Sequence, residues 1–92
     1  MDLKGKVIVV TGGGSGIGAA MLRRFSREGA AGLVVADLND AGAQAVAAEV
    51  GGLALHVDVT QEAEVQALVE RVTRHHGRID VFCSNAGLGR GA

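Results

Sequence analysis

The residues with the clearest chemical potential are the glycines of residues 11–18, which read TGGGSGIG. They follow the apolar run 7–10 and precede apolar residues at helical spacing, so they are predicted to join a strand to a helix. Glycines allow positive φ angles and let a bulky anion approach the main chain. The N–H groups at the start of the following helix attract that anion. The pattern therefore predicts a phosphate-binding turn.

A carboxylate follows the second apolar run. Asp37 ends the run 33–36 and lies 19 residues after Gly18. Dinucleotide-binding folds place the acid that binds the adenosine ribose at about this separation. An aspartate that only caps the next helix would fit the same position, and the glycines could form a tight turn without a ligand. The combination of the two features favours a dinucleotide site.

Two other ligand-binding loops have related patterns. A nucleotide-triphosphatase loop needs a lysine after its last glycine, but Ala19 and Ala20 follow Gly18, so no lysine can reach a phosphate there. An S-adenosylmethionine-dependent methyltransferase also combines a strand, a glycine turn and an acid after the second strand. Such enzymes usually have an acidic residue just before the turn, where this chain has Thr11. The methyltransferase stays open as the second reading.

The elements that must position these residues alternate along the chain. Strands are predicted at about 6–10, 33–36, 53–57 and 79–83, and helices at about 16–28, 40–50 and 61–76. Asn39 or Asp40 is the expected N-cap of the second helix and Thr60 that of the third, and Gly51 and Gly77 are expected to end them. This order predicts an α/β fold, a Rossmann-like half with a parallel sheet of four strands in the order 3-2-1-4 and three helices. Its ligand would bind at the carboxyl ends of the first and fourth strands.

Composition excludes several functions. The formal net charge of the 92 residues is −1, which gives no basic field for nucleic acid or an anionic membrane. Cys83 is the single cysteine, and no cysteine or histidine spacing indicates a metal site. His75 and His76 end the third helix, where cations interact favourably with the dipole. With no membrane span or signal peptide in the sequence, we expect one partial dinucleotide-binding domain, 1–92, in a cytoplasmic protein.

Taken together, these motifs resemble those of the short-chain dehydrogenase/reductase family over essentially the whole chain. The matching elements are Thr-Gly-x-x-x-Gly-x-Gly at 11–18, the acid at 37, an Asp-Val pair at 58–59 and an Asn-Asn-Ala-Gly-like element at 84–87, in which Ser84 replaces the first Asn. The resemblance implies a pyrophosphate site framed by Gly12, Gly16 and Gly18, with Ser15 and Ile17 nearby. It also implies that Asp58 binds the adenine amino group, that Val59 packs beside the ring, and that the ribose is lined by Asn85, Ala86 and Gly87.

Charge near the second strand decides the expected cofactor. Family members that prefer NADP usually have a basic residue at one of the positions that Ser15 and Leu38 occupy here. The 2′-phosphate of NADP would also meet the like charge of Asp37, which can cost several kcal/mol. NAD is therefore expected over NADP.

Catalytic residues of the family have no counterpart in these residues. The chain contains no tyrosine, and its two lysines are Lys4 and Lys6. The resemblance implies that the catalytic Ser and the Tyr-x-x-x-Lys pair lie beyond residue 92. We interpret the chain as the NAD-binding portion of an oxidoreductase that transfers hydride between the nicotinamide and an alcohol or carbonyl substrate, with a non-catalytic nucleotide-binding module as the alternative. An unpaired fourth strand would favour self-association.

Overall fold

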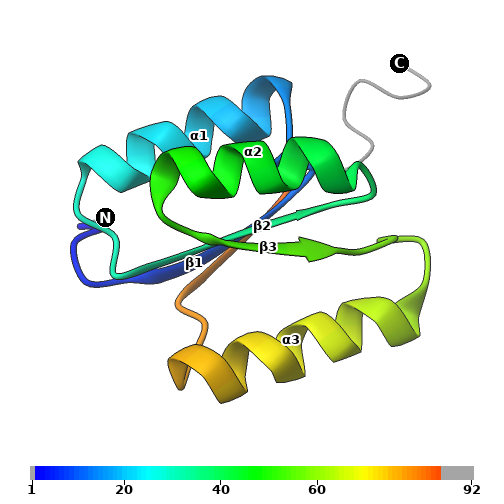
Figure 1. Cartoon of the computed structure of the whole chain (residues 1–92). Helices are drawn as coiled ribbons and strands as arrows, with labels where there is room; N and C mark the ends of the chain where they lie inside the picture. The colour runs from blue at the N-terminus through cyan, green and yellow to red at the C-terminus, as the bar shows by residue number, and fades with distance from the viewer. Residues whose placement is uncertain (1, 86–92) are drawn as a thin grey trace.

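Strands and helices alternate along the chain in the order that the sequence predicts. The computed structural model describes residues 2–85. In chain order the elements are β1 (Val7–Thr11), α1 (Gly16–Arg27), β2 (Gly32–Asp37), α2 (Asp40–Val50), β3 (Leu53–His56), α3 (Glu62–His76) and β4 (Val81–Ser84) (Figure 1). The largest shift from the predicted strand bounds is in β4, which begins at Val81 rather than near residue 79.

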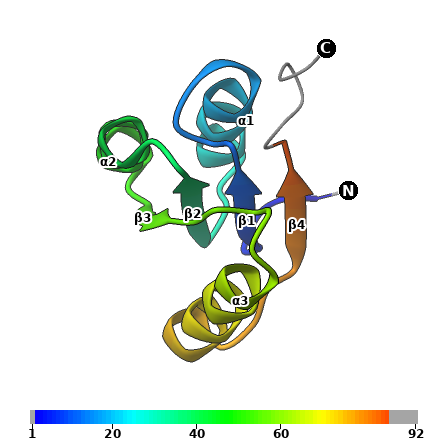
Figure 2. The same ribbon diagram turned by 90° about the vertical axis from the view of Figure 1, so that its right-hand side faces the viewer.

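The four strands form one parallel sheet in the order β3-β2-β1-β4, which confirms the predicted topology. Val9 of β1 lies opposite Val34 of β2 on one side and Phe82 of β4 on the other. Figure 2 shows the strands side by side in this order, with β3 and β4 at the two edges. The reversal of strand order therefore falls between β1 and β4, where folds of this class bind ligands.

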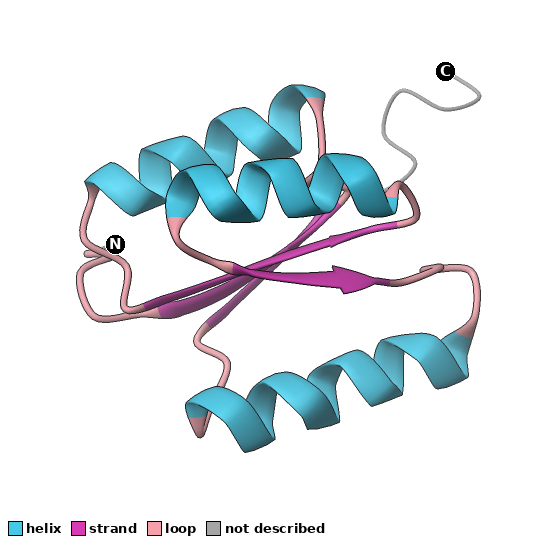
Figure 3. Ribbon diagram, in the orientation of Figure 1, coloured by secondary structure: helices cyan, strands magenta, loops and turns pink. Residues whose placement is uncertain are grey.

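Within the described residues, helices cover both faces of the sheet, two on one face and one on the other. α1 and α2 lie on one face and α3 on the opposite face (Figure 3). Side chains of a strand alternate between faces, so β1 contributes to two separate cores. The core under α1 and α2 comprises Ile8, Val10, Ala19, Leu22, Leu33, Val35, Ala43, Val46 and Ala47. The core under α3 comprises Val7, Val9, Val34, Ala36, Val57, Leu68 and Val72. This two-sided burial explains why the first strands are continuously apolar.

Helix ends follow the sequence prediction in one case and depart from it in another. Asn39 caps α2, because its side-chain oxygen accepts a hydrogen bond from Gly42 N at 3.0 Å. The predicted cap of α3 was wrong: the N-cap is Gln61, and Thr60 lies one residue before it. Thr60 instead donates its backbone N–H and its hydroxyl to the carboxylate of Asp58, at 2.9 and 2.6 Å. An ionised carboxylate is a strong acceptor close at hand, so it takes the hydroxyl.

At the amino-terminal end of the sheet, Asp80 and Arg78 connect the start of β1 to the segment before β4. The Asp80 carboxylate accepts a hydrogen bond from Val7 N at 2.8 Å and pairs with Arg78 Nε at 2.8 Å. Arg78 also donates to the carbonyl oxygen of Gly5 at 2.7 Å. These donors lower the pKa of Asp80, first through the Val7 N–H and then through Arg78. The carboxylate is therefore held in its charged form by internal partners.

His76 lies at the same end of the sheet, between α3 and β2. A Cβ on Gly32 would lie 2.7 Å from the His76 ring, so the ring lies directly against the β2 backbone. Its Nε2 is buried and has no hydrogen-bond partner among residues 2–85. Burial, and then the charge of His75, lowers the pKa of His76. Desolvation thus favours the neutral form of His76, which opposes the favourable effect of the helix dipole on a cation at this position.

Candidate functional site

The turn between β1 and α1 has a shape that only glycine permits. Gly12 and Gly16 have φ angles of 69° and 58°, in the left-handed region that other residues rarely adopt. A Cβ at Gly18 would collide with the carbonyl oxygen of Gly12. The first turn of α1 therefore packs directly on the preceding loop. The glycine pattern predicted from the sequence thus corresponds to a turn in which backbone, rather than side chains, forms the surface.

Backbone N–H groups and the start of α1 give this turn its electrostatic character. No side chain caps α1 within the described part of the chain, and its first turn contains no acidic residue. The first N–H groups of a helix have no partner within the helix, and the helix dipole adds positive potential there. Ser15, Gly16 and Ile17 are exposed at this point, with Ile17 67% exposed. An anion that approaches the turn meets main-chain donors and no acidic group of this helix end.

Asp37 lies next to the glycine turn, at the end of β2. One oxygen of its carboxylate accepts a hydrogen bond from Gly14 N at 2.9 Å, and the other accepts one from Asn39 N at 3.1 Å. A Cβ on Gly14 would lie 2.9 Å from that carboxylate and 2.9 Å from Ala43 N. Asp37 forms no salt bridge within residues 2–85. The turn and the carboxylate form a continuous surface that suits a diphosphate beside a sugar hydroxyl.

The Asp58-Val59 pair continues this edge of the sheet. Val57 N donates to the carbonyl oxygen of Asp37 at 3.1 Å, which places the end of β3 beside Asp37. Asp58 is half-buried, and its carboxylate accepts the two bonds from Thr60. Val59 packs partly against the core under α3. The chain thus brings the second acidic residue to the same end of the sheet as the first.

Asn85 and Thr11 connect the ends of β4 and β1. Asn85 N donates to the carbonyl oxygen of Thr11 at 3.2 Å, and its side-chain amide lies 3.2 Å from the sulfur of Met21. Thr11 is fully buried, with its hydroxyl 3.5 Å from the carbonyl oxygen of Cys83. The predicted contacts of Ala86 and Gly87 lie outside the described residues. The structure therefore brings together the glycine turn, Asp37, Asp58, Val59 and Asn85 at the carboxyl end of the sheet.

One residue at this carboxyl end of the sheet, Glu64, is not among the site residues predicted from the sequence. Glu64 accepts a hydrogen bond from Asp58 N at 2.9 Å through its side chain. An acidic residue at the third position of a helix is a known capping signal, and Glu64 is the third residue of α3. The signal was present in the sequence, but only the structure shows which N–H the carboxylate reaches.

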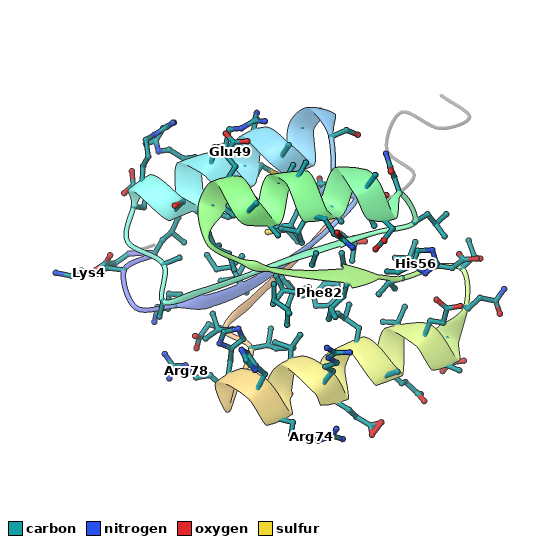
Figure 4. The ribbon with its side chains drawn as sticks, in the orientation of Figure 1. Lys4, Glu49, His56, Arg74, Arg78 and Phe82 are labelled. Atoms are coloured by element: carbon teal, nitrogen blue, oxygen red, sulfur yellow. The ribbon has the colours of Figure 1, made fainter. Side chains whose placement is uncertain are left out.

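Polar and charged side chains lie at both ends of the sheet. Figure 4 shows His56 at the end of β3, near the loop that follows it, and Lys4 and Arg78 at the opposite end of the molecule. Groups of three or more potential metal ligands do not occur in the part of the chain that the structure describes. Within the same residues, no helix has the length and apolar character needed to cross a bilayer. The arrangement is that of a dinucleotide-binding α/β fold.

Comparison with known proteins assigns the family. Residues 6–92 match the short chain dehydrogenase family, and the chain belongs to that family. A maize protein, sex determination protein tasselseed-2, is 47% identical over 92 residues, which cover 96% of this chain and 27% of that protein. The (+)-borneol dehydrogenase 1 of Salvia officinalis is 44% identical over 91 residues, which cover 97% of this chain and 35% of the relative.

A solved structure is similar to this chain in both fold and sequence. The 3-ketoacyl-(acyl-carrier-protein) reductase from Brucella melitensis, solved in complex with NADH, is 43% identical and superposes with a TM-score of 0.83. The similarity covers 87% of this chain and 34% of that protein. The chain thus spans about a third of the length of the relatives that it matches. None of these matches supports the methyltransferase reading.

Proposed function

We propose that this chain binds NAD and forms the cofactor-binding portion of an oxidoreductase. The observation that carries the proposal is the contact of Asp37 with Gly14 N inside the glycine turn, at 2.9 Å. It puts a candidate ribose-binding carboxylate directly beside the predicted diphosphate site. Membership of the short chain dehydrogenase family and the NADH complex of a 43% identical reductase support the same ligand.

Each segment of the edge would hold a different part of the dinucleotide. The main chain of residues 12–18 would bind the diphosphate, Asp37 the adenosine ribose, and Asp58 with Val59 the adenine. Ser15 and Ile17 would contact the cofactor at the start of α1, and Asn85, Ala86 and Gly87 would line the ribose. These assignments are proposals that follow from the positions of the residues and the family to which the chain belongs.

The preference for NAD rests on charge. Asp37 has no cationic partner among residues 2–85, so its negative charge is not neutralised where the 2′-phosphate of NADP would lie. Leu38, which is 44% exposed, and Ser15 offer no positive charge to that phosphate. A like-charge contact of this kind can cost several kcal/mol. NAD, which has a hydroxyl at that position, can donate a hydrogen bond to the same carboxylate.

Bound NAD would accept or supply the hydride. The chain's own residues would bind and orient the dinucleotide and keep the diphosphate in contact with main-chain donors. The sequence contains no tyrosine, so we assign the acid–base step on an alcohol or carbonyl substrate to a longer parent protein. We also expect a cytoplasmic location, on the basis of the single free Cys83. Self-association through the edge strand β4, where Phe82 is 41% exposed, is a further prediction.

Calorimetric titration of the purified chain with NAD and with NADP tests the proposal. We expect tighter binding of NAD, and we expect Asp37→Ala to weaken NAD binding about tenfold and to reduce the NAD preference, because it removes both the ribose acceptor and the like charge. Asp40→Ala is the matched control, since Asp40 is an exposed acid three residues away whose carboxylate accepts a hydrogen bond from Gln44. An NAD-to-NADP affinity ratio that stays the same in Asp37→Ala would contradict the assignment.

A further inference from the structure

The loop after β3 is held mainly by side chains. β3 is an edge strand, and its four residues are half-buried or exposed. Its last main-chain link to β2 is the bond from Val57 N to the carbonyl oxygen of Asp37. Asp58 N, the next donor along the chain, lies beyond the paired part of the strand and donates to the carboxylate of Glu64 at 2.9 Å. Where strand pairing ends, the next backbone N–H is therefore bound by the side chain of Glu64.

The geometry of Glu64 differs from that of an ordinary capping box. In a capping box, the acid at the third helical position accepts the N–H of the N-cap residue. Here the N–H of the N-cap Gln61 donates to the carbonyl oxygen of Asp58 at 3.0 Å. The Glu64 carboxylate instead accepts a hydrogen bond from the N–H of Asp58, six residues earlier in the chain. The first turn of α3 and the residue that follows Val57 are connected through this carboxylate.

A cavity lies beside this connection, although Val57 and Val59 on either side of Asp58 pack against the core under α3. Glu64 lines a cavity of about 170 Å³ between β3 and α3, together with Leu55, His56, Val57, Ala67, Leu68 and Arg71. A hydrogen bond with an ionised acceptor is stronger than one between neutral groups. Gln61 N holds the carbonyl oxygen of Asp58, and the Glu64 carboxylate holds its N–H, so Glu64 is the side chain that constrains the N–H side of this residue.

We propose that Glu64 is a positioning residue for the adenine half of the dinucleotide. The proposal rests on the proposed NAD site. Val57 N donates to the carbonyl oxygen of Asp37, so Asp58, the next residue, lies at the same end of the sheet as Asp37. We expect the base of a nucleotide whose ribose is bound at Asp37 to extend toward the Asp58 carboxylate. Both bonds from Thr60 go to the same oxygen of the Asp58 carboxylate, and a carboxylate can accept about four hydrogen bonds in all. Glu64 fixes the backbone from which that carboxylate projects, and Thr60 fixes its rotation.

A pair of ligands that differ at one group tests this role. NAD presents an amino group at C6 of its adenine, whereas nicotinamide hypoxanthine dinucleotide has a carbonyl oxygen at that position, which cannot donate to a carboxylate, and its nearest donor is the ring N1–H. We expect the unmodified chain to bind NAD about tenfold more tightly than the hypoxanthine analogue, as for one hydrogen bond to a charged group. Glu64→Ala should bring this ratio close to one. Glu64→Gln should keep most of it, because its amide oxygen can accept the same bond from Asp58 N.

Two further variants separate positioning from a general loss of structure. Glu64→Asp keeps the charge at the start of α3, but its side chain is one methylene too short to reach Asp58 N. It should therefore lower the affinity ratio as Glu64→Ala does. If the alanine variant does not fold, the aspartate variant provides the same test. Glu62→Ala is the control, an exposed acid in the same first turn, and should leave the ratio unchanged. Circular dichroism verifies folding of each variant.

The outcomes distinguish this proposal from the proposed function. If the unmodified chain binds neither dinucleotide, the NAD site itself is wrong. If it binds NAD and the hypoxanthine analogue equally well, or if Glu64→Ala and Glu64→Asp keep the full ratio, Glu64 does not position an adenine-reading group while NAD binding stands. A ratio lost in both variants and retained in Glu64→Gln establishes the role.

Discussion

The two ends of the parallel sheet hold their carboxylates in different ways. At the amino end, Asp80 pairs with Arg78 and accepts a hydrogen bond from Val7 N. At the carboxyl end, Asp37 accepts bonds from the backbone N–H groups of Gly14 and Asn39 and has no salt bridge in the described chain. The charge of Asp80 is thus neutralised within the fold, whereas that of Asp37 is left without a cation.

This difference separates stability from ligand binding. The exposed ion pair of Asp80 with Arg78 contributes little to stability by itself, so the hydrogen bond from Val7 N is the larger part of what Asp80 adds to folding. A carboxylate that is oriented by main-chain donors but not neutralised can select between ligands of different charge. The N–H groups at the start of α1 lie at the same carboxyl end, so this end combines anion-binding and hydroxyl-binding groups. Substitutions at the two ends should therefore have separable effects on stability and on cofactor choice.

The largest effect is expected for Gly18→Ala at the carboxyl end. The added Cβ would collide with the carbonyl oxygen of Gly12, which is main chain and cannot rotate away. We expect a loss of about 3 kcal/mol of unfolding free energy, in the range of severe overpacking, and a loss of NAD binding of more than about tenfold. Urea denaturation followed by circular dichroism, together with calorimetry, measures both quantities.

A neighbouring position on the same helix provides the comparison for this variant. Ala20 is exposed two residues further along α1. Ala20→Val adds more volume than Gly18→Ala but places it in solvent, so only a few tenths of a kcal/mol from helix propensity are expected. Equal effects of the two substitutions would show that the close approach of α1 to the turn is not what restricts residue 18.

A smaller effect, on stability alone, is expected for Asp80→Asn at the amino end. Hydrogen bonds from Val7 N and Arg78 lower the pKa of Asp80 below its usual value of 3.8. Because the charged form is favoured in the folded state, its contribution is present above about pH 3.8 and is lost as the pH falls through the lowered pKa. Asp80→Asn should lower the urea midpoint at pH 7 and reduce the midpoint's decline under acid. The NAD-to-NADP affinity ratio should not change.

Glu70→Gln controls for the removal of one negative charge, since Glu70 is an exposed acid on α3 without a salt bridge in the described residues. It should leave the midpoint close to that of the unmodified chain. A changed cofactor ratio in Asp80→Asn would mean that the two ends of the sheet are coupled rather than separable.

Sequence patterns predicted what depends on local chemistry and missed what depends on contacts across the fold. The apolar runs and the glycine turn predicted the sheet, its strand order and the position of Asp37. Burial on both faces of a sheet requires apolar residues along the strands, and positive φ angles favour glycine, so both features can be recognised from residue type. The residue type of Thr60 predicts a helix cap, but in the folded chain its hydroxyl donates to the Asp58 carboxylate instead. The link from Glu64 to Asp58 N depends on how the loop after β3 folds back on α3. The contact of His76 with Gly32 joins residues that are far apart in sequence.

The smallest effect is expected for the titration of His76, again at the amino end. Burial lowers the pKa of His76 below its usual value of 6.5, since the ring lies against β2 and its Nε2 has no partner in residues 2–85. The unfolded chain therefore binds a proton at a higher pH than the folded chain does. The contribution of His76 to stability is complete above about pH 6.5 and declines as the pH falls below that value, until the folded-state pKa is passed.

Urea midpoints measured from about pH 8 to about pH 5 should thus be level at first and then decrease. His76→Leu replaces the ring with an apolar side chain that does not titrate, so it should flatten the decrease between about pH 6.5 and about pH 5. His75→Gln changes the exposed neighbour, whose ring centroid lies 4.6 Å from that of His76, and should keep most of the decrease because burial is the larger cause of the shift. A decrease that persists in His76→Leu would assign the acid sensitivity to other groups. NAD affinity at neutral pH should be the same in both histidine variants, since neither lies at the carboxyl end that holds Asp37.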